Sequence, residues 1–225
     1  MKNVFIIFLS FYTSYLFAEE SVLLNKSRII YNESDKRNSV DAENKSQRQS
    51  YLVQAWIENE EHQITKDFIV TPPLHVSRPG MEKSIEIWKV NAKLPSDKER
   101  LYYFFEKAIP SLDKKDANNG ISIATGNRIK LIYRPNGLRM SLIQVKESLV
   151  FKCQQGHLII ENPTPFYITF TKVNILREDE NSFMIPPEST LTIKGKVREN
   201  GKKITYSIIN DFGNEEGPYS SDIMS

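Results

Sequence analysis

The feature that most constrains the fold is a succession of short segments in which apolar and polar residues alternate. In residues 51–58, for example, Tyr51, Val53, Ala55 and Ile57 fall on one face. Alternation with a period of two is the pattern of a β-strand with one buried face. Turn signals separate the segments, and no convincing helix pattern lies between them. The other expected strands are 22–31, 68–71, 84–90, 101–109, 121–135, 149–153, 157–161, 166–173, 190–197 and 204–210.

Many short strands at regular spacing predict an all-β protein built from immunoglobulin-like β-sandwiches. The chain has 225 residues, and its strand pattern restarts after the turn at Asn136 and Gly137. We therefore expect two sandwich domains, residues 19–136 and 137–225, each near the size of one immunoglobulin-like domain. A cleft between the two domains is a natural place for a binding site.

Residues 1–18 have the pattern of a secretory signal peptide. Lys2 gives a basic start, residues 4–17 form an apolar run, and Ala18 precedes an acidic pair. The alternative is a membrane anchor, but a spanning helix needs about 20 apolar residues. No later segment is long enough to span, so we expect an exported protein without membrane insertion after the signal is removed.

Composition excludes several classes of function. Hydrophobic residues are 40% and charged residues 26% of the chain, as in a soluble globular protein. A net charge of +2 gives no argument for nucleic acid. Cys153 is the single cysteine, so no intramolecular disulfide is expected. The histidines, His62, His75 and His157, lie too far apart in sequence for zinc-ligand spacing.

No signature of catalysis is present in the sequence. There is no P-loop, no dinucleotide glycine fingerprint and no nucleophile elbow. Cys153 reads as a small core residue rather than a nucleophile. The aromatic run in residues 101–109 reads as sandwich core, because basic residues do not interleave with it. We expect neither an enzyme nor a bound cofactor or metal.

Residues 121–135 predict one long strand with an exposed first half. Ile121 and Ile123 alternate with small or polar residues, and the preceding residues 111–120 are polar and rich in turn formers. An apolar row on an uncovered strand invites another chain to pair with it. The sequence therefore indicates a strand that is available to a partner.

Four charged residues lie within or beside strand cores. Arg28 shares the parity of Leu24 and Ile30, which predicts that it lies on their apolar face, and Lys130 is flanked by two apolar residues. Either these cations reach the surface along their aliphatic stems or they form an anion site between the domains. Arg134 and Asp211 adjoin strand cores in the two halves, which predicts a structural clamp between them.

The chain resembles the periplasmic pilus (fimbrial) chaperones of the PapD-like family over essentially its whole mature length. The motifs IKLIYRP at 129–135 and ENPTPFY at 161–167 are the most specific. The other matching segments are 24–31, 51–59, 71–73, 78–80, 94–104 and 209–213.

The resemblance implies two immunoglobulin-like domains at an angle and a mechanism of β-strand addition. The chaperone would lend a strand to a pilus subunit that lacks its last strand, and would deliver the subunit to an outer-membrane usher. By the resemblance, Ile121, Ile123 and Thr125 are the residues that would enter the subunit from the donor strand. Arg28 and Lys130 match two basic residues that bind the subunit's C-terminal carboxylate. The short segment 111–120 resembles the short-loop branch of the family.

The resemblance also implies that Glu99, Arg134 and Asp211 form a salt-bridge network between the domains. Three departures stand out. Thr125 occupies a position where a larger apolar residue is usual, and a C-terminal disulfide frequent in the family cannot form here. Lys130 is nine residues from Ile121, so strict alternation puts it opposite the donor face; we expect a bulge, a strong twist or a subunit that wraps the strand.

A different class of function remains open from the residues alone. An exported two-domain adhesin or ligand-binding module would bind a surface ligand and would need no strand donation. Neighbouring genes for an usher and for pilin-like proteins would favour the chaperone. The sequence does not identify the subunit, or whether the free chaperone covers its donor strand by self-association.

Overall fold

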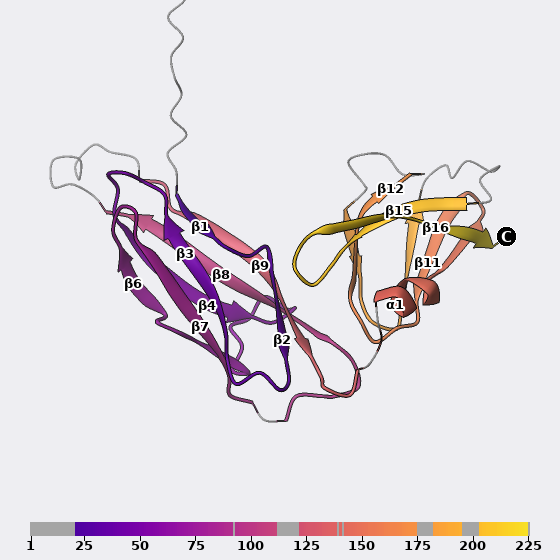
Figure 1. Ribbon diagram of the computed structural model, residues 1–225, viewed down its shortest axis with the longest axis horizontal. Coiled ribbons are helices and arrows are strands. Elements are labelled where there is room, and N and C mark those ends of the chain that lie inside the picture. Colours follow the sequence, from indigo (N-terminus) through magenta and orange to yellow (C-terminus); the bar gives the residue numbers. More distant parts are fainter. Residues whose placement is uncertain are drawn as a thin grey trace, which may run out of the picture.

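The computed structural model describes residues 21–91, 93–111, 122–138, 140, 142–174, 182–194 and 203–224. The predicted signal peptide, residues 1–18, lies outside the described residues. The described chain forms two β-rich units, one from its first part and one from its last part, as the sequence predicts (Figure 1). The hairpin between β15 (Lys203–Ile209) and β16 (Glu215–Met224) reaches from the second unit toward the first (Figure 1).

The N-terminal unit consists of two sheets packed on one core. The first sheet has the order β1-β3-β7-β5 and the second has the order β2-β9-β8-β4-β6. The strands are β1 (Val22–Leu24), β2 (Arg28–Asn32), β3 (Asn38–Asn44), β4 (Tyr51–Glu58), β5 (Phe68–Thr71), β6 (Leu74–Ser77), β7 (Glu82–Lys89), β8 (Arg100–Pro110) and β9 (Thr125–Arg134).

The strands of the C-terminal unit follow the order β13-β12-β15-β16-β10-β11-β14. A short helix, α1 (Leu142–Ser148), precedes them. Besides β15 and β16 they are β10 (Val150–Gln154), β11 (His157–Asn162), β12 (Ile168–Val173), β13 (Phe183–Ile185) and β14 (Ser189–Lys194).

Each unit has its own hydrophobic core, because alternate residues of facing strands turn inward. Phe104, Leu131 and Tyr133 are fully buried in the N-terminal unit. Phe151 and Phe170 are fully buried in the C-terminal unit, where their rings meet edge to face with centroids 6.4 Å apart. Cys153 is partly buried against the second core.

The observed strands follow the expected segments closely where alternation is strong. β4 and β5 have the predicted bounds. Four strands and the helix were missed: β3, β6, β13, β16 and α1. β3 has the sequence NSVDAEN and β16 has EEGPYSSDIM, so each carries few apolar residues to mark a buried face. Their pairing partners, rather than their own composition, stabilise them as strands.

The expected single strand at residues 22–31 is wrong, because the chain changes sheets within it. β1 pairs with β3 in one sheet, and β2 pairs with β9 in the other. The alternation of inward and outward side chains in β1 therefore does not predict the faces of side chains in β2, because residues 25–27 separate the two strands. Within β2, Ile29 and Tyr31 are buried, while Arg28 and Ile30 lie on the opposite face. The prediction that Arg28 shares the face of Ile30 holds, but this face points out of the core.

The expected long strand at residues 121–135 is shorter in the structure. β9 begins at Thr125, residues 122–124 precede it without strand pairing, and Ile121 lies outside the described residues. The predicted bulge is absent from the β8–β9 pairing, which keeps one register from Ala108–Thr125 to Arg100–Tyr133. Lys130 consequently lies on the face opposite to that of residue 125 by simple alternation.

Candidate functional site

Arg28 and Lys130 lie side by side on two neighbouring strands. β2 and β9 run parallel, and Arg28 and Lys130 are Cα partners in their register. The residues that follow them, Ile29 and Leu131, turn into the core, so alternation directs both cations to the outward face. The structure thus brings together two basic residues that are about a hundred positions apart in the sequence.

No carboxylate forms an ion pair with either cation within the described part of the chain. The Arg28 Nε is buried and has no hydrogen-bond partner among the residues that the structure describes. Burial lowers the pKa of Arg28, although the charge of Asp211 acts in the opposite direction. Burial and the charges of Arg28 and Arg128 lower the pKa of Lys130. Two partly desolvated cations without a counter-ion form a site suited to a carboxylate.

Arg134 links the two units through two carboxylates. Its Nε donates to Glu99 Oε1 at 2.7 Å, and its two terminal nitrogens donate to the Asp211 oxygens at 2.6 and 2.8 Å. Burial acts to lower the pKa of Arg134, but the hydrogen bond to Asp211 and the charges of Glu99 and Asp211 outweigh it and raise that pKa. The Glu99 side chain is 1% exposed, whereas that of Asp211 is 51% exposed.

Further hydrogen bonds join the units around this cluster. The backbone N–H of Tyr167 donates to Glu99 Oε2 at 2.7 Å, and the N–H of Glu99 donates to the carbonyl of Pro165 at 2.9 Å. Lys98 forms an ion pair with Glu188 at 2.9 Å. Because Glu99 contacts Arg134 from one unit and Tyr167 from the other, it couples β8 and β9 to the start of β12.

The hairpin tip of residues 210–214 lies against the beginning of β2. A Cβ built on Gly213 would lie 2.1 Å from the Ser27 Oγ, so only a glycine fits there without movement, and its φ of +86° also favours glycine. The neighbouring Phe212 is exposed and lines a hollow with Arg28, Arg134 and Asp211. The hollow beside Arg28 is therefore bounded by both units.

The candidate donor segment is exposed at the start of β9. Ile123 is 72% exposed, and Thr125 is exposed as well, while Ile121 lies outside the described residues. β9 pairs with β8 from Thr125 onward but with β2 only from Lys130 onward. Among the described strands, none pairs with the second edge of residues 125–129.

β1 lies near this unpaired edge but contacts it through side chains. Asn127 Nδ2 donates to the carbonyl of Val22 at 3.0 Å, and the Ser21 and Thr125 hydroxyls are hydrogen-bonded to each other. These contacts involve odd-numbered residues of β9, which turn toward the other sheet. They do not amount to a backbone ladder on residues 125–129.

Sequence reasoning missed a buried carboxyl group beside the same segment. Glu106 lies between Phe104 and Ala108 on the inward face of β8 and is 1% exposed. Its Oε2 accepts a hydrogen bond from Asn127 Nδ2 at 2.8 Å, and its Oε1 has no hydrogen-bond partner among the described residues. Burial raises the pKa of Glu106 to about 7, although the hydrogen bond from Asn127 acts to lower it. The sequence signal that could have found it is that Glu106 alternates in step with Phe104 and Ala108, which places it on the inward face.

The aromatic run 101–109 was only half correctly interpreted. Tyr102 and Phe104 are buried, but Tyr103 and Phe105 lie on the outward face of β8. Arg128, from the neighbouring strand β9, stacks on Tyr103 with 3.7 Å between its guanidinium carbon and the ring centroid. The basic partner comes from another strand, so it was invisible within the run itself.

Two absences apply to the described residues. No group of three or more His, Cys, Asp or Glu residues there is arranged to hold a metal ion. No helix in that part of the chain is long and apolar enough to cross a membrane.

Two family models match the chain. Residues 21–139 match the N-terminal domain of PapD, described as a pili and flagellar-assembly chaperone. Residues 144–219 match the C-terminal domain of the pili assembly chaperone PapD. Together the two matches cover most of the described chain.

Individual relatives agree with the family models. The chain is 37% identical over 194 residues to the chaperone protein FocC of Escherichia coli, which covers 85% of this chain and 86% of that protein. It is 37% identical over 198 residues to the chaperone protein FimC of Escherichia coli, which covers 87% of this chain and 82% of that protein. The crystal structure of the periplasmic chaperone SfaE has a TM-score of 0.75 and 32% identity, with coverage of 91% of this chain and all of that one (100%).

The same fold occurs in a solved complex. The structure of the Salmonella enterica SafA pilin with the SafB chaperone includes a chain with a TM-score of 0.77 and 24% identity to this one. The match covers 90% of this chain and 96% of that one. At this identity the likeness shows a shared fold.

Proposed function

The chain belongs to the PapD-like family of pilus assembly chaperones, which are not enzymes, and we propose that it captures pilus subunits by donor-strand complementation. In this proposal it binds, folds and caps the subunit in the periplasm and then delivers it to an outer-membrane usher. Residues 1–18 direct its export and are removed. The domains are residues 19–136 and 137–225.

The observation that carries the proposal is the half-paired edge of β9. On one side, β2 occupies the edge only from Lys130 to Arg134. Residues 125–129 leave a row of backbone donors and acceptors open to a strand from another chain. Main-chain hydrogen bonds along such an edge give affinity, and alternate side chains give specificity.

The two cations at the end of this edge favour one direction for the added strand. A strand that fills the edge in line with β2 has one of its ends beside Arg28 and Lys130. A carboxylate end forms charge-assisted hydrogen bonds there, while an amino end would be repelled. The added strand therefore ends beside Arg28 and runs parallel to β9, as β2 does.

The donor side chains lie just before and at the start of β9, next to the open edge. We assign Ile121, Ile123 and Thr125 to the subunit groove. The exposure of Ile123 supports this assignment, because a large apolar side chain left in water gains stability when a partner covers it. Thr125 is smaller and supplies less apolar area.

The Glu99–Arg134–Asp211 cluster has a structural role in this proposal. It holds the C-terminal unit beside the end of β9 where the subunit terminus binds. Paired carboxylates and a bidentate guanidinium fix geometry better than a single charged contact. Self-association is one way in which the free protein could cover its donor strand until a subunit replaces the second copy.

Copurification from periplasm tests the proposal directly. The tagged full chain is expressed with its signal, isolated from the periplasm of its own organism, and its partners are identified by mass spectrometry. We expect pilus subunits in stoichiometric amounts with the parent protein and none with Ile123→Asp. A protein that purifies without subunits and binds a surface ligand instead would be an adhesin or ligand-binding module.

A further inference from the structure

An aromatic and cationic surface adjoins the open edge of β9 on the outward face of its sheet. Trp56 and Phe105 are register partners whose rings stack 5.2 Å apart at an angle of 5°. Phe105 is also the register partner of Arg128, and Tyr103 is the partner of Lys130. We call Trp56, Tyr103, Phe105 and Arg128 the outward platform. It borders a groove that continues to residues 124–126.

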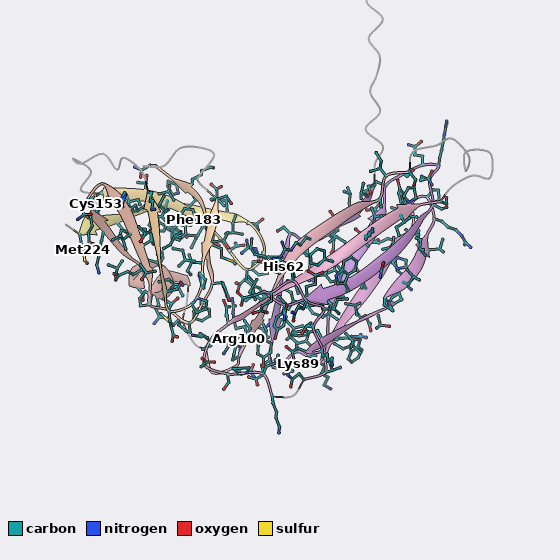
Figure 2. All side chains as sticks on the ribbon, turned by 180° about the vertical axis from the view of Figure 1, so that it is seen from behind. His62, Lys89, Arg100, Cys153, Phe183 and Met224 are labelled. Atoms are coloured by element: carbon teal, nitrogen blue, oxygen red, sulfur yellow. The ribbon has the colours of Figure 1, made fainter. Side chains whose placement is uncertain are left out.

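Contacts from the neighbouring strand β8 and from a loop hold the Arg128 side chain in place. Its guanidinium carbon lies 3.7 Å from the Tyr103 ring centroid and 5.3 Å from that of Phe105. A terminal nitrogen lies 3.0 Å from His62 Nδ1. His62 has the unusual φ of 62°, and it lies on the side of the N-terminal unit that faces the C-terminal unit (Figure 2). An arginine ordered in this way loses little further freedom on binding.

Arg128 has no carboxylate partner within the described part of the chain. Two carboxylates of the loop and strand that precede His62 are engaged elsewhere. Glu58 accepts from Trp56 Nε1 at 2.8 Å, and Glu60 accepts from the Tyr167 hydroxyl at 3.0 Å. A guanidinium stacked over a ring keeps its N–H groups in its own plane, parallel to the ring, where a carboxylate can accept two of them.

The position of Arg128 relates it to the end of an added strand. Arg128 precedes Lys130 by two residues, so both side chains leave the same face of β9. At about 3.3 Å per residue, they are separated by about 7 Å along the strand. A parallel strand whose terminal carboxylate binds Lys130 has its last residues alongside Arg128.

We propose that Arg128 binds an acidic side chain among about the last three residues of the strand that adds to β9. This inference rests on the proposed function, because it needs a strand on that edge with its C-terminus at Arg28 and Lys130. The platform then acts as a second carboxylate site that selects the partner's sequence. The terminal carboxylate fixes register, and the side-chain carboxylate adds specificity.

Synthetic peptides test the inference with the full mature chain. The probe is a short peptide of alternating valine and threonine with a free C-terminus, and Asp or Asn replaces each of the final residues in turn. We expect one of these positions to give about tenfold tighter binding with Asp than with Asn, as a charge-assisted pair predicts. Arg128→Gln should abolish this difference. Arg78→Gln, an exposed turn residue with the same change of charge, should preserve it.

The terminal carboxylate separates this inference from the proposed function. C-terminal amidation should weaken binding to the parent protein and to Arg128→Gln alike. If amidation has no effect, or no peptide binds, strand addition with a terminal carboxylate fails. If amidation matters but Asp and Asn bind equally at every position, the role of Arg128 fails alone. A peptide with Phe at the same position serves as a further probe. If it binds more tightly than the Asp peptide, the proposed role of Arg128 is overturned, because Arg128 would then act by stacking on an aromatic ring. The comparison on the parent protein does not depend on whether Arg128→Gln folds.

Discussion

Arg28 and Lys130 are direct partners in the parallel pairing of β2 and β9, with both side chains on the outward face. Like charges that lie opposite each other on neighbouring strands are destabilising. The described residues supply no ion-pair partner to relieve this repulsion. An arrangement that costs stability in the free protein is typical of a binding site.

Alanine at either cation should separate binding from stability. We expect Arg28→Ala or Lys130→Ala to melt at or above the temperature of the parent protein, because repulsion is relieved. Subunit binding should weaken by about 2–5 kcal/mol, as expected when one partner of a buried charged contact is removed. Copurification of subunits and thermal melting measure the two effects. Lys66→Ala, at an exposed position, should change neither. Normal subunit recovery with both variants would contradict the carboxylate site.

The clamp should respond unequally to loss of its members. Arg134→Ala leaves the nearly inaccessible Glu99 without its cation and should cost about 3–5 kcal/mol in the free energy of unfolding. Because Asp211 is half exposed, Asp211→Ala should cost only about 1 kcal/mol or less. Urea unfolding of both variants measures the difference, and equal losses would argue against this ordering.

The donor segment should be dispensable for folding and required for capture. Ile123→Asp removes an apolar side chain that is exposed in the free protein, so the melting temperature should not change. Burial of a large aliphatic side chain is worth about 1.5–3 kcal/mol, and the variant should lose this and also bury a charge in the groove. Copurification should recover little or no subunit.

Hydrogen exchange gives an independent measurement on the same segment. The amides of Ile123 and Thr125 should exchange fast in the monomeric protein and slowly with subunit bound. Strong protection in the free monomer would mean that the edge is already paired, and strand donation would have to be abandoned. Thr125→Leu should retain or strengthen capture, since it adds apolar area at a donor position.

Glu106 should make stability depend on pH. Its pKa is raised from 4.5 to about 7 by burial, so folding favours the protonated form. The stabilisation is complete below about pH 4.5 and is lost as the pH rises through 7. A difference of this size corresponds to roughly 3 kcal/mol. Glu106→Gln should therefore stabilise the protein at pH 8 relative to the parent and make little difference at pH 4.5.

Urea unfolding at several pH values tests this expectation. The difference in unfolding free energy between Glu106→Gln and the parent should grow between pH 5 and 8. The matched change Glu61→Gln, at an exposed position, should leave the pH profile unaltered. A constant difference across the range would mean that Glu106 titrates normally in the folded protein.

The sequence predicted the parts of the fold that local pattern determines. Alternation placed β4 and β5 and indicated most other strands, because a half-buried strand must alternate whichever strand lies beside it. The motif residues Arg28, Lys130, Arg134 and Asp211 were also selected before any geometry was available. The polar strands β3 and β16 were missed, since few apolar residues mark their inward faces and their pairing partners help to fix them as strands.

Tertiary structure decided which of these residues meet. Alternation within β9 places Lys130 and residue 125 on opposite faces of the strand. Only the parallel register with β2 sets Lys130 beside Arg28. The stacking of Arg128 on Tyr103 likewise depends on the β8–β9 pairing. Alternation assigns a side chain to a face of its own strand. Its neighbours on that face come from strands distant in sequence, and long-range pairing and packing fix their register.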